Sequence, residues 1–196
     1  MVRPLFSHSD FLEAALSLIA EHGPSAVTVG AITGRLKAPT GSFYHRFVSR
    51  DALLAELWFK TVVNFQGGID AALEAGDGLK AALHTPDWVR AHLDEGRLLL
   101  LYHRDDFVQG TWPKALLDGL EDQKRRGEAK IERFARATFG CAGPDEIRCI
   151  QYVLAEMPVA AVRRHLQHRE SPPPVVDWLI TETYRAVIAG HRARLD

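Results

Sequence analysis

A run of polar and basic side chains between residues 37 and 50 has the chemistry needed to hold nucleic acid. Lys37 and Arg50 flank two tripeptides, Thr40-Gly41-Ser42 and Tyr44-His45-Arg46. Ammonium, guanidinium, imidazole and phenol groups donate hydrogen bonds to phosphate oxygens, and small polar side chains can approach base edges closely. We therefore interpret these residues as a candidate DNA contact surface.

Two other groups of side chains contain possible metal ligands or acid-base residues. His165 and His168 stand near Glu170 at a spacing that lets two imidazoles chelate one metal from a helix. We interpret them as surface residues at a helix end, where histidine is favourable against the helix dipole, and expect no metal. The second group shows no diagnostic spacing and consists of His92, Glu95, His103, Asp105 and Asp106.

Sequence motifs of common enzymes and cofactor sites do not occur. There is no Gly-X-Ser-X-Gly, phosphate-binding loop or His-Glu-X-X-His motif, so we expect neither enzyme activity nor a cofactor. Cys141 and Cys149 fit neither a metal-ligand spacing nor a disulfide framework. We expect free thiols in a reducing cytoplasm, with a redox-sensing pair as the alternative.

The candidate surface stands on two short helical patterns with a break between them. Thr28 is a hydroxyl N-cap for the first pattern. Pro39 cannot extend that helix and biases Ala38 away from helical angles, so the first helix must end before it. Its apolar side chains recur at the spacing of one helix face and are Val29, Ile32 and Leu36.

The second pattern restarts at Pro39 or Thr40 and turns Phe43 and Phe47 inward. Small polar residues at its start suit close approach to bases, and free backbone N–H groups there favour phosphate. Helix, tight turn and second short helix predict a helix-turn-helix, whose second member can enter a DNA major groove. The alternative is a segment of a helical enzyme in which the aromatic residues are simply core.

In order and spacing, this part of the sequence resembles the DNA-binding domain of the TetR (tetracycline-repressor-like) transcriptional regulators. The matching segments are Glu21-His22-Gly23, Thr28 to Leu36, Gly41 to Phe47 and Ser49 to Leu54. They cover about the first quarter to third of the chain. The sequence departs from the family's frequent Ser at Pro39 and its frequent His at Arg46.

The resemblance implies which residues contact DNA. Thr40, Gly41 and Ser42 would face bases. Phosphates would be held by side chains on both helices and at the start of the next one. The full predicted set is Thr28, Lys37, Thr40, Gly41, Ser42, Tyr44, His45, Arg46 and Arg50.

Composition indicates a globular chain rather than a polycation. The 196 residues are 46% apolar and 25% charged with a formal net charge of −1, so DNA affinity must come from a local patch. Residues 1–50 hold five Lys and Arg, Arg3 among them, against three Asp and Glu. No secretory leader and no run of about 18 apolar residues occurs, so we expect a cytoplasmic protein without a membrane segment.

Periodicity predicts an all-α fold of about nine helices. A three-helix DNA-binding domain over residues 1–50 would be joined by a long fourth helix to a helical effector-binding and dimerisation domain over residues 51–196. Thr85-Pro86-Asp87 is typical of a helix start, Pro158 predicts a kink, and a final helix should follow the prolines at 172–174.

The middle of the chain is where the resemblance implies a small-molecule pocket. Aromatic residues surround the apolar run from Leu98 to Leu101, although core packing is the alternative for each of them. The candidate pocket residues are Phe65, Trp88, Tyr102, His103, Phe107 and Trp112. Two long apolar-faced helices near residues 145–168 and 174–194 would pack against those of a second copy, as in TetR-like homodimers.

The sequence therefore predicts a homodimeric, ligand-responsive transcriptional regulator, a repressor released from a near-palindromic operator by a small, largely apolar effector. Two other classes remain open. One is a helical small-molecule-binding protein without specific DNA binding. The other is a helical enzyme that uses residues near His103.

Overall fold

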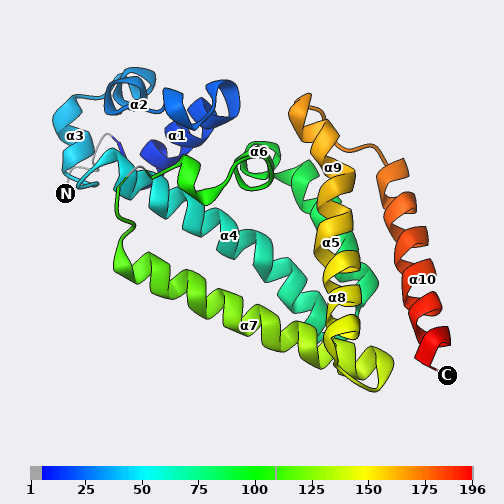
Figure 1. The fold of residues 1–196 in the computed structure, drawn as a ribbon. Coiled ribbons are helices and arrows are strands. Elements are labelled where there is room, and N and C mark those ends of the chain that lie inside the picture. The colour runs from blue at the N-terminus through cyan, green and yellow to red at the C-terminus, as the bar shows by residue number, and fades with distance from the viewer. Residues whose placement is uncertain (1–5, 109, 196) are drawn as a thin grey trace. The chain divides into compact units, whose positions relative to one another are not determined.

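A computed structural model describes residues 6–108 and 110–195, and no described residue lies in a β-strand (Figure 1). The all-α prediction is therefore confirmed. Helices α8 and α9 are joined through a π-helical turn into one continuous helix. With that helix counted once, and the 3-10 turns left aside, the described residues form nine helices.

The chain divides into two compact units, neither of which is a continuous stretch. Unit 1 is Met1–Val62 with Asp94–Leu120, and unit 2 is Val63–Leu93 with Glu121–Asp196. This division differs from the predicted single boundary at residue 50. It falls within two helices, α4 (Arg50–Glu74) and α7 (Lys114–Phe139), each of which contributes residues to both units.

Unit 1 contains the predicted helix-turn-helix. Besides the beginnings of α4 and α7, its elements are α1 (His8–His22), a 3-10 turn (Pro24–Ala26), α2 (Val29–Leu36), α3 (Thr40–Tyr44), α6 (Leu93–Leu101) and a second 3-10 turn (Arg104–Asp106). Helix α1 begins at a capping box, in which Asp10 N donates to Ser7 Oγ at 3.2 Å and Ser7 N donates to Asp10 Oδ2 at 2.6 Å. Ser7 is therefore the N-cap of α1.

The core of unit 1 draws on residues far apart in sequence. Buried side chains of α1, α2, α3 and α4 form one cluster with four residues from the later segment, namely Leu98, Phe107, Val108 and Trp112. A stretch of about 50 residues is marginally stable on its own, because the fraction of surface buried on folding falls as the chain shortens. The segment from α6 to the start of α7 supplies the missing cover.

Unit 2 packs α5 (Gly78–Ala91) against α9 (Met157–Gln167) and α10 (Val175–Leu195). The predicted helix start at Thr85-Pro86-Asp87 is wrong, because α5 begins earlier and continues through Pro86. Asp77 caps this helix, accepting a hydrogen bond from Lys80 N at 2.9 Å. Burial of Thr85, Pro86 and their neighbours on one face offsets the backbone bond that a proline removes.

The proline spacer before α10 is held by one arginine. Arg90 Nε donates to the Pro172 carbonyl at 2.9 Å, and Arg90 Nη2 donates to the Pro173 carbonyl at 3.3 Å and to Asp177 Oδ1 at 2.8 Å. The guanidinium thereby ties the spacer and the start of α10 to α5. The predicted final helix is confirmed as α10 and begins immediately after this spacer.

The long helix before the spacer changes its geometry near Pro158. Residues Tyr152–Glu156 form a π-helical turn between α8 (Pro144–Gln151) and α9. Pro158 has no N–H for the helix ladder, and a wider turn just before it accommodates the lost bond. The sequence thus located the irregularity but not its form. No helix in the described residues combines the length and apolarity needed to span a lipid bilayer.

Candidate nucleic-acid interface

Helix α2 is fixed at both ends by local hydrogen bonds. Thr28 Oγ1 accepts a hydrogen bond from Ala31 N at 3.0 Å, as an N-cap does. Lys37 ends the helix in the left-handed region with φ of 53°, and Ala38 N donates to the Thr33 carbonyl at 2.9 Å. The tight turn therefore places the Lys37 side chain at the surface between α2 and α3.

Aromatic side chains pack helix α3 against α1. Phe43 and Phe47 are buried, as predicted, and their ring centroids lie 5.5 Å apart. Phe11 of α1 meets Phe43 edge-on, with the centroids 5.9 Å apart. Such contacts add to the burial of apolar area and fix how α3 is rotated about its axis.

The rotation of α3 leaves its opposite face exposed. Thr40, Gly41, Tyr44 and His45 are exposed, with Tyr44 at 57%. Within the described residues, no hydrogen bond or ion pair engages the side chains of Thr40 or His45 or the Tyr44 hydroxyl. Open space surrounds the position where a Cβ on Gly41 would stand, so packing within the chain gives no reason for glycine there. These groups are available to an external partner.

Ser42 lies at the edge of this face and is half-buried. Its hydroxyl donates to the Pro39 carbonyl at 2.6 Å. This bond ties Ser42 to the residue that precedes α3, and Pro39 itself makes no side-chain cap hydrogen bond. The hydroxyl oxygen keeps its lone pairs for an external donor.

Two of the predicted contact residues turn inward. Arg46 donates from Nη1 to the Ser42 carbonyl at 2.8 Å and from Nη2 to the Phe6 carbonyl, and its guanidinium lies over the Phe11 ring. Arg46 therefore closes α3 onto α1. The prediction that it contacts DNA is not carried further.

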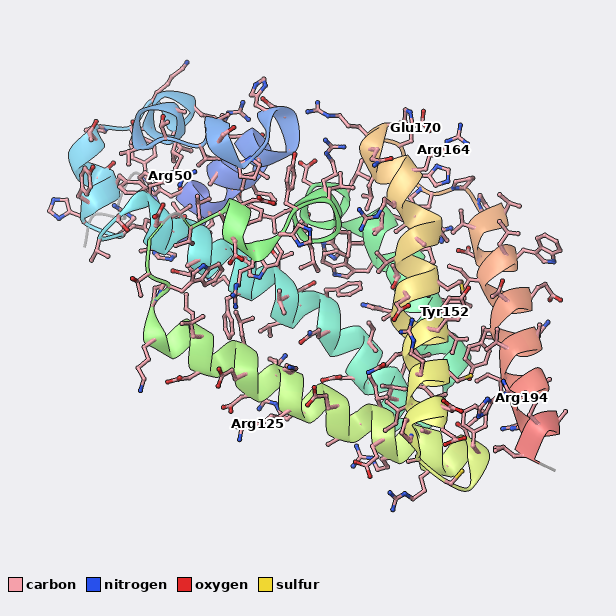
Figure 2. The ribbon with its side chains drawn as sticks, in the orientation of Figure 1. Arg50, Arg125, Tyr152, Arg164, Glu170 and Arg194 are labelled. Carbon is pink, nitrogen blue, oxygen red and sulfur yellow. The ribbon has the colours of Figure 1, made fainter. Side chains whose placement is uncertain are left out.

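Arg50 (labelled in Figure 2) also points into unit 1, from the start of α4. Nε donates to the Val27 carbonyl at 2.5 Å and Nη2 to the Pro24 carbonyl at 2.9 Å. Nη1 donates to Asp51 Oδ1 at 2.8 Å and to the Phe107 carbonyl at 3.3 Å. Because these bonds occupy the guanidinium, we also leave Arg50 out of the proposed phosphate contacts.

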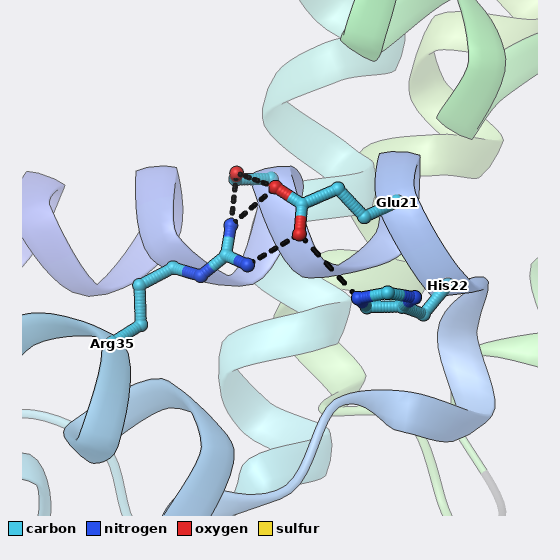
Figure 3. A network of polar contacts seen from close by, with 4 residues as sticks. Glu21, His22 and Arg35 are labelled. Carbon is cyan, nitrogen blue, oxygen red and sulfur yellow. Dashed lines mark hydrogen bonds and ion pairs between the residues drawn. The ribbon is translucent and has the colours of Figure 1, made fainter.

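A polar clamp joins α1 to α2 on the outside of unit 1 (Figure 3). Arg35 Nη1 donates to Glu21 Oε1 at 2.7 Å, and the Ser17 hydroxyl donates to the same oxygen at 3.0 Å. The Arg35 bond, followed by that of Ser17, lowers the pKa of Glu21 from 4.5 to about 2. The clamp sets the position of α2, and it occupies another of the basic side chains counted in the sequence.

The positive charge available at this surface is therefore smaller than the sequence suggested. Arg35, Arg46 and Arg50 are engaged within unit 1, and Arg3 lies outside the described residues. Lys37 is exposed and makes no side-chain hydrogen bond or ion pair with any residue in the described ranges. The surface thus combines one available ammonium group with neutral donors and an imidazole.

Sequence reasoning missed Val48 at the edge of this surface. Its side chain is 89% exposed, in the loop between α3 and α4. The signal was present, because Phe47 takes the inward position and the next residue of a short loop must point elsewhere. An exposed apolar side chain beside the polar face of α3 is suited to contact with a sugar or a thymine methyl group.

The six predicted pocket residues are divided between the two units. Tyr102, His103, Phe107 and Trp112 belong to unit 1, where Phe107 is fully buried and His103 is exposed. Phe65 and Trp88 belong to unit 2, and Trp88 Nε1 donates to Asn64 Oδ1 at 2.7 Å. Phe107 and Trp112 are core residues, the alternative that the sequence had left open.

Hollows in unit 2 lie elsewhere. One of about 590 Å³ lies along α8, the π-helical turn and α10, where Figure 2 labels Tyr152 and Arg194. Another of about 420 Å³ is bordered by the end of α4, α7 and α10. None of the six predicted residues lines either hollow.

The remaining candidate groups have ordinary environments. His168 bonds through Nδ1 with the Arg164 carbonyl at 2.8 Å, as expected for a residue at a helix end. Within the described residues, no three His, Cys, Asp or Glu side chains are grouped so as to hold a metal. Cys141 and Cys149 are free thiols, and burial raises the pKa of Cys149.

Comparison with known proteins places this geometry in context. Residues 11–57 match the sequence model described as "Bacterial regulatory proteins, tetR family". These residues include α1, α2, α3 and the beginning of α4. No curated protein matches the sequence.

Solved structures share the fold along nearly the whole chain. A putative tetR family transcription regulator from Shewanella sp. PV-4 has a TM-score of 0.68 and 19% identity, covering 96% of this chain and 98% of that one. The fatty acid degradation regulator FadR of Bacillus halodurans has a TM-score of 0.64 and 13% identity, covering 96% of both chains. The FadR of Bacillus subtilis, solved in complex with stearoyl-CoA, has a TM-score of 0.61 and 14% identity, covering 94% of this chain and 99% of that one.

Proposed function

We propose that this protein is a ligand-responsive, DNA-binding transcription regulator that acts as a repressor, because residues 11–57 match the model of the tetR family of bacterial regulatory proteins. The observation that carries the proposal is the division of side chains along α3. Phe43 and Phe47 fix the helix to unit 1, while Thr40, Tyr44 and His45 are exposed and their side chains make no hydrogen bond or ion pair with the described residues. A helix held in this way is ready to enter a major groove.

Each outward residue receives a role from its chemistry. Thr40, Gly41 and Ser42 face bases, where small side chains allow close approach and hydroxyls both donate and accept. Lys37, Tyr44 and His45 hold phosphates, with the exposed Thr28 beside them at the start of α2. Phosphate contacts set affinity and register, and base contacts set sequence choice.

A second copy of the chain completes the operator-binding form. Val175, Trp178 and Leu179 are exposed near the start of α10, with Trp178 at 60%, while Val176, Ile180 and Ile188 of the same helix are buried. Tyr152 is another exposed apolar side chain, on the helix that precedes the spacer. These faces, within residues 145–168 and 174–194, support a homodimer that reads two half-sites about 34–36 Å apart.

The effector is a small molecule whose binding to the rest of the chain opposes DNA binding. The stearoyl-CoA complex of a protein with this fold supports a ligand-binding role without identifying the ligand of this one. Because coupling between two sites is reciprocal, DNA must weaken effector binding by the same factor by which effector weakens DNA binding. The proposal assigns no catalytic role to His103.

The test is fluorescence anisotropy of the purified protein with the DNA that flanks its own gene, against scrambled DNA, at several salt concentrations. A saturable affinity about a thousandfold tighter than for scrambled DNA supports the proposal. Since Lys37 is the available cation of the described interface, the salt dependence should be shallow, with few counterions released per subunit. Equal, weak affinity for both DNAs would instead favour a helical small-molecule-binding protein without specific DNA binding.

A further inference from the structure

A hollow in unit 2 has the makings of a small-molecule site. It has a volume of about 420 Å³, within the range of about 300–1,000 Å³ that is usual for small ligands. Its wall comes from three helices and the turn after α4. The lining residues are Leu73, Glu74, Gly76, Arg133, Phe134, Ala137, Thr138, Tyr184 and Arg192.

Two aromatic rings fixed against α5 form the apolar part of the wall. At Gly78, a Cβ would overlap both the Tyr184 hydroxyl oxygen and Cζ of Phe134, so both rings pack directly on the glycine backbone. Phe134 is buried and Tyr184 is half-buried. Leu73 and Ala137 extend this surface. A site with fixed rings does not need to be ordered by its ligand, which favours binding.

Two arginines provide the polar part of the lining. Arg192 donates from Nε to the Thr138 carbonyl at 3.1 Å, and this bond fixes the side chain while leaving its two Nη groups available. Arg133 makes no hydrogen bond or ion pair to any residue in the described ranges. Both side chains are exposed and line the hollow.

The one carboxylate in the lining, that of Glu74, already has a partner within the protein. Glu74 Oε1 forms an ion pair with Lys130 Nζ at 2.9 Å, and that interaction lowers the pKa of Glu74. Burial raises the pKa of Tyr184, which therefore keeps its hydroxyl proton as a donor. The hollow thus presents two guanidinium groups and a phenol, with its one carboxylate already paired.

We propose that this hollow binds a small organic carboxylate with an aromatic or short aliphatic body, which Arg133 and Arg192 hold by its charged end while Phe134 and Tyr184 contact its body. Guanidinium groups match carboxylates in geometry and bind them through charge-assisted hydrogen bonds. The larger hollow lies entirely on the two helices proposed to form the dimer and is not assigned a ligand, whereas only Tyr184 and Arg192 of the smaller one belong to them. The assignment rests on the proposed function only in naming this ligand as the effector, and it replaces the expectation of a largely apolar one.

The test is isothermal titration calorimetry of the full chain with sodium benzoate and sodium octanoate, at ionic strength matched with sodium chloride. Benzamide is the neutral counterpart of benzoate. We expect saturable binding of at least one carboxylate, benzamide weaker than benzoate by about tenfold or more, and a loss of about tenfold in each of Arg133→Gln and Arg192→Gln. Arg136 is an exposed arginine on the same helix, α7, and does not line the hollow. The variant Arg136→Gln should therefore bind the carboxylate as tightly as the wild type does.

Absence of saturable binding for both carboxylates at millimolar concentration overturns the assignment. Equal affinity for benzoate and benzamide, or equal affinity in the two lining variants and Arg136→Gln, also overturns it. Adding the carboxylate to the anisotropy assay separates this assignment from the proposed function. Arginine-dependent binding in a protein that shows no specific DNA affinity would uphold the carboxylate site and refute the regulator.

Discussion

The tripeptide Tyr-His-Arg occurs twice in unit 1, and its two copies have different roles. At residues 44–46 it ends α3, where Tyr44 and His45 point to the surface and Arg46 turns inward. At residues 102–104 it follows α6, and there Tyr102 packs against Phe107 while Arg104 lies exposed over the Trp112 ring. The same side chains thus contribute a candidate binding face in one place and core cover in the other.

The difference lies in the neighbouring residues. Phe43 and Phe47 occupy the inward positions on either side of the first copy, so its tyrosine must point outward. In the second copy, Phe107 comes five residues after Tyr102, across a 3-10 turn, and both rings share one side. Aromatic and basic residues therefore indicate a binding surface only where a regular element shows which face they occupy.

The largest expected effect comes from removing the core aromatic beside the second tripeptide. Phe107→Ala should lower the free energy of unfolding by about 3–5 kcal/mol. The Phe107 ring is fully buried against Trp58 and Tyr102, so its removal leaves a cavity. Tyr44→Ala, at the exposed copy, should change it by no more than about 0.5 kcal/mol. Urea denaturation of both variants measures the two changes in the free energy of unfolding. Equal losses would contradict the difference between the two tripeptides.

The next effect distinguishes the two basic residues that flank α3. Arg50→Gln should lower the free energy of unfolding by about 1–3 kcal/mol, because it removes the Arg50 donors to the Val27 and Pro24 carbonyls, of which Pro24 keeps its bond from Val27 N at 3.2 Å. The salt dependence of DNA binding by Arg50→Gln should match that of the wild type. Lys37→Gln should leave stability nearly unchanged and lower the slope of log K against log salt by about 1.

Anisotropy at four or more salt concentrations gives both slopes. A smaller slope in Arg50→Gln together with an unchanged one in Lys37→Gln would reverse the assignment. It would return Arg50 to the phosphate contacts predicted from the sequence.

We expect a smaller effect on DNA affinity when the hydroxyl oxygen is removed from each of the two tyrosines in turn. Tyr44→Phe should weaken binding to flanking and scrambled DNA alike by about three- to tenfold, the value of one hydrogen bond. Tyr102→Phe keeps the ring that packs on Phe107 and should bind DNA as the wild type does. If Tyr44→Phe changed sequence preference rather than affinity, the hydroxyl would face a base and not a phosphate.

The smallest effect concerns the clamp between α1 and α2. The folded-state pKa of Glu21 is lowered from 4.5 to about 2, so the ionised carboxylate stabilises the fold above pH 4.5, and this contribution is lost as the pH falls toward 2. Glu21→Gln should therefore be slightly less stable than the wild type at pH 6, with a narrower gap at pH 3. The effect should be small and reduced by salt because the pair is exposed.

Denaturation midpoints of both proteins at the two pH values give the comparison. Parallel pH dependence in the wild type and in Glu21→Gln would mean that the Arg35 clamp does not persist in solution.

Sequence reasoning succeeded where structure is local. The Thr28 cap, the break at Pro39 and the inward Phe43 and Phe47 follow from contacts within a few residues, and each is confirmed. It failed where a side chain chooses among distant partners. Nothing near Arg50 in the sequence indicates that the Phe107 carbonyl is within its reach, and nothing near Trp112 shows that it joins the core cluster of unit 1 rather than a ligand pocket.

The interleaving of the two units limits which parts of this protein can be exchanged with a relative. A hybrid that transplanted only the first fifty residues would keep the bonds from Arg50 to the Pro24 and Val27 carbonyls. It would lose the Phe107 carbonyl, to which Arg50 also donates. The smallest transferable cassette is instead two pieces, Met1–Val62 and Asp94–Leu120, which must travel together. Thr40 and Gly41, the exposed residues proposed to face bases, are free of that constraint, so we expect single substitutions there to change operator preference while the cassette stays intact.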